Sequence, residues 1–212
     1  MKRLLSVLLI VAMLICTMIS CKNETKESGS LCDQFYDETD VITNLVRMNI
    51  TYLDANGKKQ TGDIVVELNP TAAPITVKNF QTLVSEDFYD GLIFHRVIEG
   101  FMIQGGGFTE SNSHKESASI KGEFSANGVK NDLKHTRGVI SMARTNDMNS
   151  ASSQFFICQE DYDYGNGNYA AFGKVVKGIK VVDAIAAVAT NYNDKPLSNV
   201  VIESIKFVTY EG

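Results

Sequence analysis

The stretch FHRVIEGFMIQGG, residues 94–106, predicts two short β-strands separated by a loop. Successive side chains of a strand point to opposite faces of its sheet. Met102 and Gln104 should therefore share one face of the second strand, and Phe101 and Ile103 the other. Alternation alone does not bring Phe101, Met102 and Gln104 to one site. The glycines that end the stretch predict a bend, because no Gly-Lys-Ser/Thr ending of a phosphate-binding loop follows.

A second pattern, upstream of this stretch, predicts a β-hairpin. Apolar residues alternate with polar ones from Val46 to Tyr52, as in a half-buried strand. Asn56-Gly57 supplies two residues that readily adopt the positive φ of a tight hairpin turn. Residues 63–68, Asp-Ile-Val-Val-Glu-Leu, are then the returning strand.

Two further segments have the apolar spacing of helices. Pro74 suits the first turn of a helix that continues to about residue 85, and residues 179–189 place apolar side chains on one face. Strand-like runs lie at residues 93–98, 101–104, 138–142, 154–157, 170–173 and 200–210. Together these elements predict a mainly β fold, a closed eight-stranded antiparallel barrel capped by two α-helices, since closure removes unpaired strand edges.

The composition indicates one globular domain and excludes several functions. The chain has 212 residues, of which 44% are hydrophobic, and a formal net charge of -5. Loss of Lys2 and Arg3 with a cleaved signal leaves -7, a charge that a nucleic-acid backbone repels. His95, His114 and His135 lie in separate segments, and the four cysteines form neither a CxxC pair nor a zinc framework. We therefore expect neither nucleic-acid binding nor a metal site.

The N-terminus has the order of a bacterial lipoprotein signal peptide. A basic pair precedes an apolar run over residues 4–19, which is shorter than the ~20 apolar residues that a membrane-spanning helix needs. Residues 18–21, Met-Ile-Ser-Cys, resemble a lipobox, where the signal is cut before a cysteine that becomes lipidated. We predict a signal peptide over residues 1–20, lipidation of Cys21, and a lipid-anchored location in the bacterial cell envelope, on the periplasmic side or the surface of a membrane.

Residues 21–40 are predicted to comprise the lipidated cysteine and a flexible linker. Lys, Glu, Asn, Ser and Gly dominate this segment, and so few apolar residues cannot repay the entropy of ordering. The globular domain is expected over residues 41–212. With Cys21 lipidated, only Cys32 and Cys158 remain to form a bridge; we expect two free thiols, with that bridge as the alternative.

Residues 94–106 closely resemble the core signature of the cyclophilins, a family of peptidyl-prolyl cis-trans isomerases. Residues 138–144 and 152–157 resemble the family's other active-site strand, and residues 171–175 resemble its closing strand. The resemblance extends over about residues 63–210, with the motifs in family order. It implies a cyclophilin-like domain that isomerises Xaa-Pro bonds of proline-containing polypeptides in exported or envelope proteins, as a monomer without cofactor or metal.

Arg96 is the predicted catalytic residue. An Xaa-Pro bond faces a barrier of ~18–20 kcal/mol, because twisting the bond breaks amide resonance. In the twisted state the proline nitrogen regains a lone pair, so a fixed cationic donor binds that state better than either planar isomer. The resemblance assigns the remaining roles: Phe101, Met102 and Phe156 line the proline pocket, Gln104 bonds the substrate backbone, Ala143 and Arg144 bond the peptide before proline, and Gln154 helps to position Arg96.

The segment after residue 161 departs from the family pattern. Tyr164 and Gly165 stand where members commonly have Trp or His and then Leu, whereas Tyr169 fits a position that holds His or Tyr. Tyr164 and Tyr169 are therefore expected at the substrate, with Tyr164 filling a thinned pocket wall. Two alternatives stay open: the departure is compatible with a proline-peptide binding module with weak or no turnover, and the tether suggests a surface interaction protein that uses the barrel as a scaffold.

Overall fold

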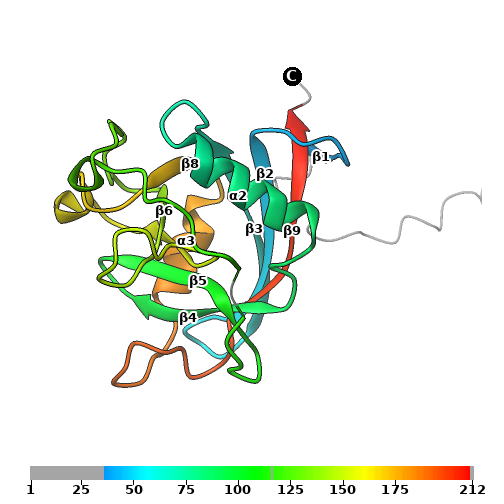
Figure 1. Ribbon diagram of the computed structural model, residues 1–212. Coiled ribbons are helices and arrows are strands. Elements are labelled where there is room, and N and C mark those ends of the chain that lie inside the picture. The colour runs from blue at the N-terminus through cyan, green and yellow to red at the C-terminus, as the bar shows by residue number, and fades with distance from the viewer. Residues whose placement is uncertain (1–35, 116, 211–212) are drawn as a thin grey trace, which may run out of the picture. The chain divides into compact units, whose positions relative to one another are not determined.

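The computed structural model describes residues 36–115 and 117–210 (Figure 1). Within these residues, antiparallel strands close into a barrel, with the bounds β2 (Leu45–Leu53), β3 (Lys59–Leu68), β4 (Leu92–Ile98), β5 (Met102–Thr109), β6 (Val139–Met142), β7 (Phe155–Cys158), β8 (Ala171–Lys177) and β9 (Val201–Tyr210). Neighbouring strands follow the order β9-β2-β3-β8-β6-β7-β5-β4, and β4 pairs again with β9. The predicted closed eight-stranded antiparallel barrel is confirmed.

Two α-helices pack their apolar faces into the same core as the strands. α2 (Pro74–Ser85) begins with the predicted proline in its first turn. α3 (Ile179–Ala186) ends before the predicted boundary at residue 189, because the chain turns there through a bond from Val188 N to Ile185 O of 3.2 Å. Two short 3-10 helices lie in loops, η1 (Ser125–Asn127) and η2 (Asp163–Gly165).

The ring of Phe80, on α2, is surrounded by other aromatic rings inside the core. Ring centroids of Tyr89, Phe172 and Phe155 lie 5.1, 5.3 and 5.7 Å from it. All four side chains are almost completely buried. Side chains fill the interior of small barrels of this kind. A binding site is therefore to be sought on the outer face of the barrel.

The predicted hairpin joins β2 to β3, with a slightly longer loop than a two-residue turn. Asp54 N bonds Lys58 O at 2.9 Å, and the Asp54 carboxylate accepts the backbone NH groups of Asn56 and Lys58. Gly57 has a φ of 75°, a conformation that glycine adopts without steric cost. The Asn-Gly pair thus lies in the turn, as predicted.

The glycines at residues 105–107 lie inside β5 rather than after it, so the strand is longer than predicted. Gly106 has a φ of 82°, and the β4–β5 register shifts twice between Leu92 and Arg96. A Cβ on Gly106 would lie 2.9 Å from Ser153 O. The predicted bend is therefore a set of irregularities within a continuous strand, which glycine permits.

A short additional strand, β1 (Tyr36–Glu38), pairs with the end of β9. Tyr36 faces Tyr210 with ring centroids 5.5 Å apart, and Glu38 forms an ion pair with Arg47. These residues belong to the segment predicted as flexible linker, so the ordered domain begins before residue 41. Tyr36 supplies apolar surface that the polar composition of the linker obscures.

The other predictions for the N-terminus concern residues outside the described part of the chain. They include the signal peptide, the lipidation of Cys21 and the state of Cys32. Cys158 is described, and it is a buried free thiol. Among the helices of residues 36–115 and 117–210, none has the length and apolar content needed to cross a membrane.

Candidate active site

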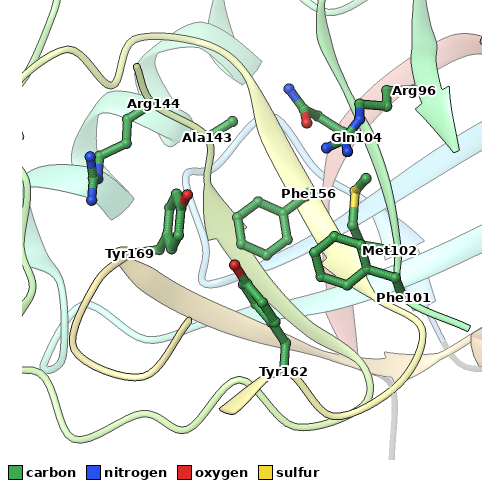
Figure 2. A pocket seen from close by; sticks show the side chains of 9 residues that line it. All are labelled: Arg96, Phe101, Met102, Gln104, Ala143, Arg144, Phe156, Tyr162 and Tyr169. Atoms are coloured by element: carbon green, nitrogen blue, oxygen red, sulfur yellow. The ribbon is translucent and has the colours of Figure 1, made fainter. Parts of the chain in front are cut away.

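A cavity of about 280 Å³ opens on the outer face of the barrel, where β4, β5 and β7 lie side by side (Figure 2). All of the predicted site residues except Gln154 and Tyr164 line it. The lining residues are Arg96, Phe101, Met102, Gln104, Ala143, Arg144, Phe156, Tyr162 and Tyr169.

Strand register explains why residues from three strands meet here. Arg96 of β4 pairs with Gln104 of β5, and Gln104 pairs in turn with Phe156 of β7. Directly opposed residues on neighbouring strands project from the same face. Met102, two residues before Gln104, shares that face, as the alternation predicts. Phe101 joins them from the turn that precedes β5, where its NH bonds Ile98 O at 3.1 Å.

Apolar side chains form the floor of the cavity, and aromatic rings form one wall. Met102 and Phe156 are 2% and 5% exposed, so they make a nearly dry floor. The Phe156 ring lies in the middle of the lining residues in Figure 2, with the Tyr169 ring perpendicular to it at 5.7 Å. The Phe101 and Tyr162 rings meet edge to face at 4.7 Å. This part of the cavity suits a small apolar ring.

Arg96 stands at the edge of the cavity, beside Gln104 (Figure 2). Its Nε lies 3.4 Å from Asp194 Oδ2, and its side chain is 42% exposed. No other hydrogen bond from this guanidinium is made within the described part of the chain. The terminal nitrogens are therefore available to a bound ligand.

Gln154 does not line this cavity, but it lines an adjoining one of about 280 Å³ together with Gln104, Ala143 and Arg144. Gln104 Nε2 donates to Gln154 Oε1 at 3.1 Å. A Cβ on Gly107 would lie 2.4 Å from Gln154 Cγ, so the glycine leaves room for this side chain. Gln154 was predicted to help position Arg96. Among the described residues its side chain bonds Gln104, the cross-strand neighbour of Arg96, and the guanidinium itself is bonded by Asp194.

The Arg144 side chain is bound to carbonyl groups of its own chain. Nε and Nη2 donate to Asn168 O at 3.1 and 2.9 Å, and Nη1 donates to Thr145 O at 2.8 Å. The guanidinium also lies over the Tyr169 ring, 4.8 Å from its centroid. Arg144 therefore ties the segment that carries Tyr169 to the cavity.

Tyr162, which the sequence did not single out, occupies the wall position that was expected of Tyr164. The Tyr164 side chain, in η2, is 70% exposed and does not line the cavity. Tyr162 is held by a bond from its NH to His135 O of 2.7 Å, and its ring turns toward Phe101. Gly165 was a local signal of this exchange, because a residue without a side chain leaves space for a neighbouring ring.

Two titratable groups lie behind the floor, and both are held neutral. Burial raises the pKa of the Cys158 thiol to about 12, so it is not a nucleophile at neutral pH. Burial lowers the pKa of His135, whose Nε2 is 2.9 Å from Ser141 Oγ and whose ring stacks on Phe156. The arrangement can bind and polarise a ligand, and it offers no group for covalent catalysis among the described lining residues.

Comparisons with known proteins agree with this geometry. A sequence profile described as "Cyclophilin type peptidyl-prolyl cis-trans isomerase/CLD" matches residues 52–207. A peptidyl-prolyl cis-trans isomerase of Acinetobacter baylyi is 49% identical over 140 residues, covering 63% of this chain and 72% of that protein. Peptidyl-prolyl cis-trans isomerase B of Escherichia coli is 44% identical over 156 residues, covering 68% of this chain and 93% of that protein.

Solved structures show the same fold. A cyclophilin type peptidyl-prolyl cis-trans isomerase of Cryptosporidium parvum, crystallised in the presence of the dipeptide Ala-Pro, has a TM-score of 0.58 and 27% sequence identity. The match covers 74% of this chain and 97% of that one. The chain belongs to the cyclophilin-type peptidyl-prolyl cis-trans isomerases, the enzymes that rotate Xaa-Pro peptide bonds.

Proposed function

We propose that this isomerase acts on exported or envelope proteins and that Arg96 is its catalytic residue. One observation carries the catalytic assignment. Arg96 lines the same cavity as the apolar side chains of Phe101, Met102 and Phe156. A prolyl ring seated on this floor would bring its nitrogen toward the arginine.

The chemistry needs no covalent step. Rotation of the unassisted bond takes tens to hundreds of seconds. Shortening this to milliseconds requires only ~5–7 kcal/mol, at 1.36 kcal/mol for each factor of ten. A donor fixed at the nitrogen contributes in the twisted state, where the lone pair is present, and much less in the planar states. The terminal nitrogens of Arg96, which bond no group of residues 36–115 and 117–210, serve this purpose.

The apolar floor contributes in a second way. A planar amide has more charge separation than a twisted one, so transfer into a dry cavity costs the planar form more. Met102 and Phe156, both almost fully buried, provide that environment. The same residues therefore bind the prolyl ring and favour the twisted amide, in which resonance is weakened.

The polar side of the cavity holds the rest of the peptide. Gln104 is oriented by Gln154 and bonds the substrate backbone. Because the Arg144 side chain is already bound to Asn168 O and Thr145 O, contact with the peptide before proline falls to the backbone of residues 143–144. Side-chain identity at residue 144 then matters little for that contact.

A proline-peptide isomerisation assay tests the catalytic proposal, using residues 21–212 with Cys21→Ser. We expect Arg96→Ala to lower kcat/KM by about 10²–10³, as removal of a fixed transition-state donor does in other enzymes. Peptide affinity, measured by calorimetry, should change far less. Equal turnover of the two proteins, with peptide binding retained, would favour a binding module instead.

The membrane tether is proposed from the lipobox resemblance at residues 18–21 and the apolar run before it. Two or more acyl chains give a stable anchor, whereas one gives marginal binding. Cells fed an alkyne-labelled fatty acid should label the wild-type protein but not Cys21→Ser. An unlabelled wild-type protein would refute the tether. If the wild-type protein is labelled, protease treatment of intact cells tests which face of the membrane the domain occupies.

A further inference from the structure

The loop that precedes β9 is fastened to β4 immediately after Arg96. Val97 N donates to Asp194 O at 2.8 Å. Asp194 N bonds Asn191 O at 3.0 Å, and Asn191 N bonds Lys195 O at 2.8 Å, so the loop is closed on itself. Lys195 Nζ also reaches Asn112 Oδ1 at 3.0 Å. The position of Asp194 relative to β4 is thus fixed by backbone bonds.

Asp194 has a backbone conformation that favours glycine. Its φ is 61°, in the left-handed region that few residues other than Gly, Asn and Asp adopt. Glycine would meet the backbone requirement without strain. The side chain that the chain carries here is a carboxylate, and Oδ2 lies 3.4 Å from Arg96 Nε.

Stability does not account for this ion pair. The Arg96 and Asp194 side chains are 42% and 43% exposed. Pairs between side chains this exposed contribute little to folding, because water and salt screen them. A long arginine side chain at the edge of a cavity has many rotamers, however, and an acceptor at Nε removes most of them.

We propose that Asp194 is a positioning residue that orients Arg96 toward the bound prolyl nitrogen. The inference rests on the proposed catalytic role of Arg96. A carboxylate at Nε engages the side of the guanidinium nearest its stem and leaves Nη1 and Nη2 for the substrate. The loop supplies the carboxylate from a fixed backbone, so the donors are aimed before substrate binds.

Two substitutions at residue 194 are compatible with the left-handed backbone, and they separate the effect of the acceptor oxygen from that of the negative charge. Asp194→Gly removes the acceptor without adding strain, and Asp194→Asn keeps an acceptor oxygen without the charge. In the peptide assay, Asp194→Gly should lower kcat about threefold to tenfold and change KM less than twofold. Asp194→Asn should retain more than half of the wild-type kcat.

Asp87 offers a matched control. It also has a positive φ, of 50°, and it also pairs with a cation, Lys206 Nζ at 2.5 Å. Neither Asp87 nor Lys206 lines the active-site cavity. Asp87→Gly should therefore shift the melting temperature about as much as Asp194→Gly does and leave kcat unchanged.

The outcomes distinguish this inference from the function on which it rests. Loss of activity in Arg96→Ala together with wild-type or raised kcat in Asp194→Gly refutes the positioning role alone. Wild-type activity in Arg96→Ala refutes the catalytic assignment itself. If both single variants are impaired, the double variant should be no slower than Arg96→Ala, because Asp194 acts only through the arginine. A further additive loss would contradict the inference.

Discussion

The ring of Tyr162 occupies the space that a side chain at residue 165 would need. A Cβ built on Gly165 would lie 2.6 Å from Tyr162 Cδ1 and 2.8 Å from His135 Cγ. Gly165 does not have a positive φ, so its backbone does not require glycine. The glycine is explained by the ring beside it, and the pair rebuilds a pocket wall that the sequence had suggested was thinned.

Gly165→Ala should therefore disturb both stability and binding. The added methyl group forces the Tyr162 and His135 rings apart, and overpacking of this kind costs about 1–3 kcal/mol of unfolding free energy. Displacement of the Tyr162 ring should raise the KM for a proline peptide several-fold. Urea unfolding and the peptide assay measure the two effects.

Two further variants control this experiment. In a Tyr162→Ala background, Gly165→Ala should cost less stability than in the wild type, because one of its two clashes is gone. Tyr164→Ala removes a neighbouring tyrosine that is 70% exposed and should change neither KM nor stability. A large effect of Tyr164→Ala would mean that the wall is formed by the other tyrosine in solution.

The Gln104–Gln154 bond predicts an energetic coupling between the two residues. Gln154→Ala frees the Gln104 amide from its 3.1 Å partner, and we expect kcat/KM to fall about threefold to tenfold. In a Gln104→Ala background the same substitution should have almost no effect. Kinetics of the four proteins in this cycle measure the coupling, and independent, additive losses would exclude it.

Loss of the Glu123 carboxylate, which lies away from the cavity, should strongly lower the stability of the fold. Glu123 is 2% exposed, and its carboxylate accepts Thr76 N, Thr76 Oγ1 and Ile75 N at 2.8, 2.7 and 3.1 Å. These groups belong to the first turn of α2, whose NH groups have no partner within the helix. Glu123→Ala should lower the free energy of unfolding by about 2–4 kcal/mol. Glu67→Ala, at an exposed position of β3, should lower it by less than ~0.5 kcal/mol.

His95 predicts a loss of stability in acid. Burial lowers its pKa from 6.5 to about 4. The folded state therefore binds the proton less readily than the unfolded state. The stability that neutral His95 contributes is complete above pH ~6.5 and is lost as the pH falls from there toward 4. We expect a loss of about 1–3 kcal/mol between pH 7 and pH 4 from this residue. Urea unfolding at several pH values should show a flatter dependence for His95→Gln, and parallel curves would contradict the assignment.

Local patterns predicted most of the fold, because they depend on neighbours in sequence. Alternation located the hairpin of β2 and β3, and apolar spacing located α2. β1 was missed because its partner, residues 208–210 of β9, lies at the other end of the sequence. The end of α3 was placed three residues too late, since Ala187, Val188 and Ala189 continue the apolar character after the helical hydrogen bonds have ended.

The site was predictable only in part for a similar reason. Alternation placed Met102 and Gln104 on one face, but it does not give the register that adds Arg96 from the neighbouring strand β4 and Phe156 from β7, which lies much later in the sequence. The family resemblance, rather than the pattern, supplied those residues. Tyr162 and Asp194 depend on loop conformation, namely the turn around η2 and a positive φ, and neither has a periodic signal in the sequence.

The pairing of β1 with β9 sets the length of the connection between Cys21 and the folded domain. Between Cys21 and Tyr36 lie only residues 22–35, fourteen in all. A polypeptide extends at most ~3.3–3.6 Å per residue, so the steps from Cys21 to Tyr36 span no more than about 54 Å. With Cys21 held in a bilayer as proposed, the domain would stay within this distance of the lipid headgroups. Its substrates would then be polypeptides that come equally close to the membrane.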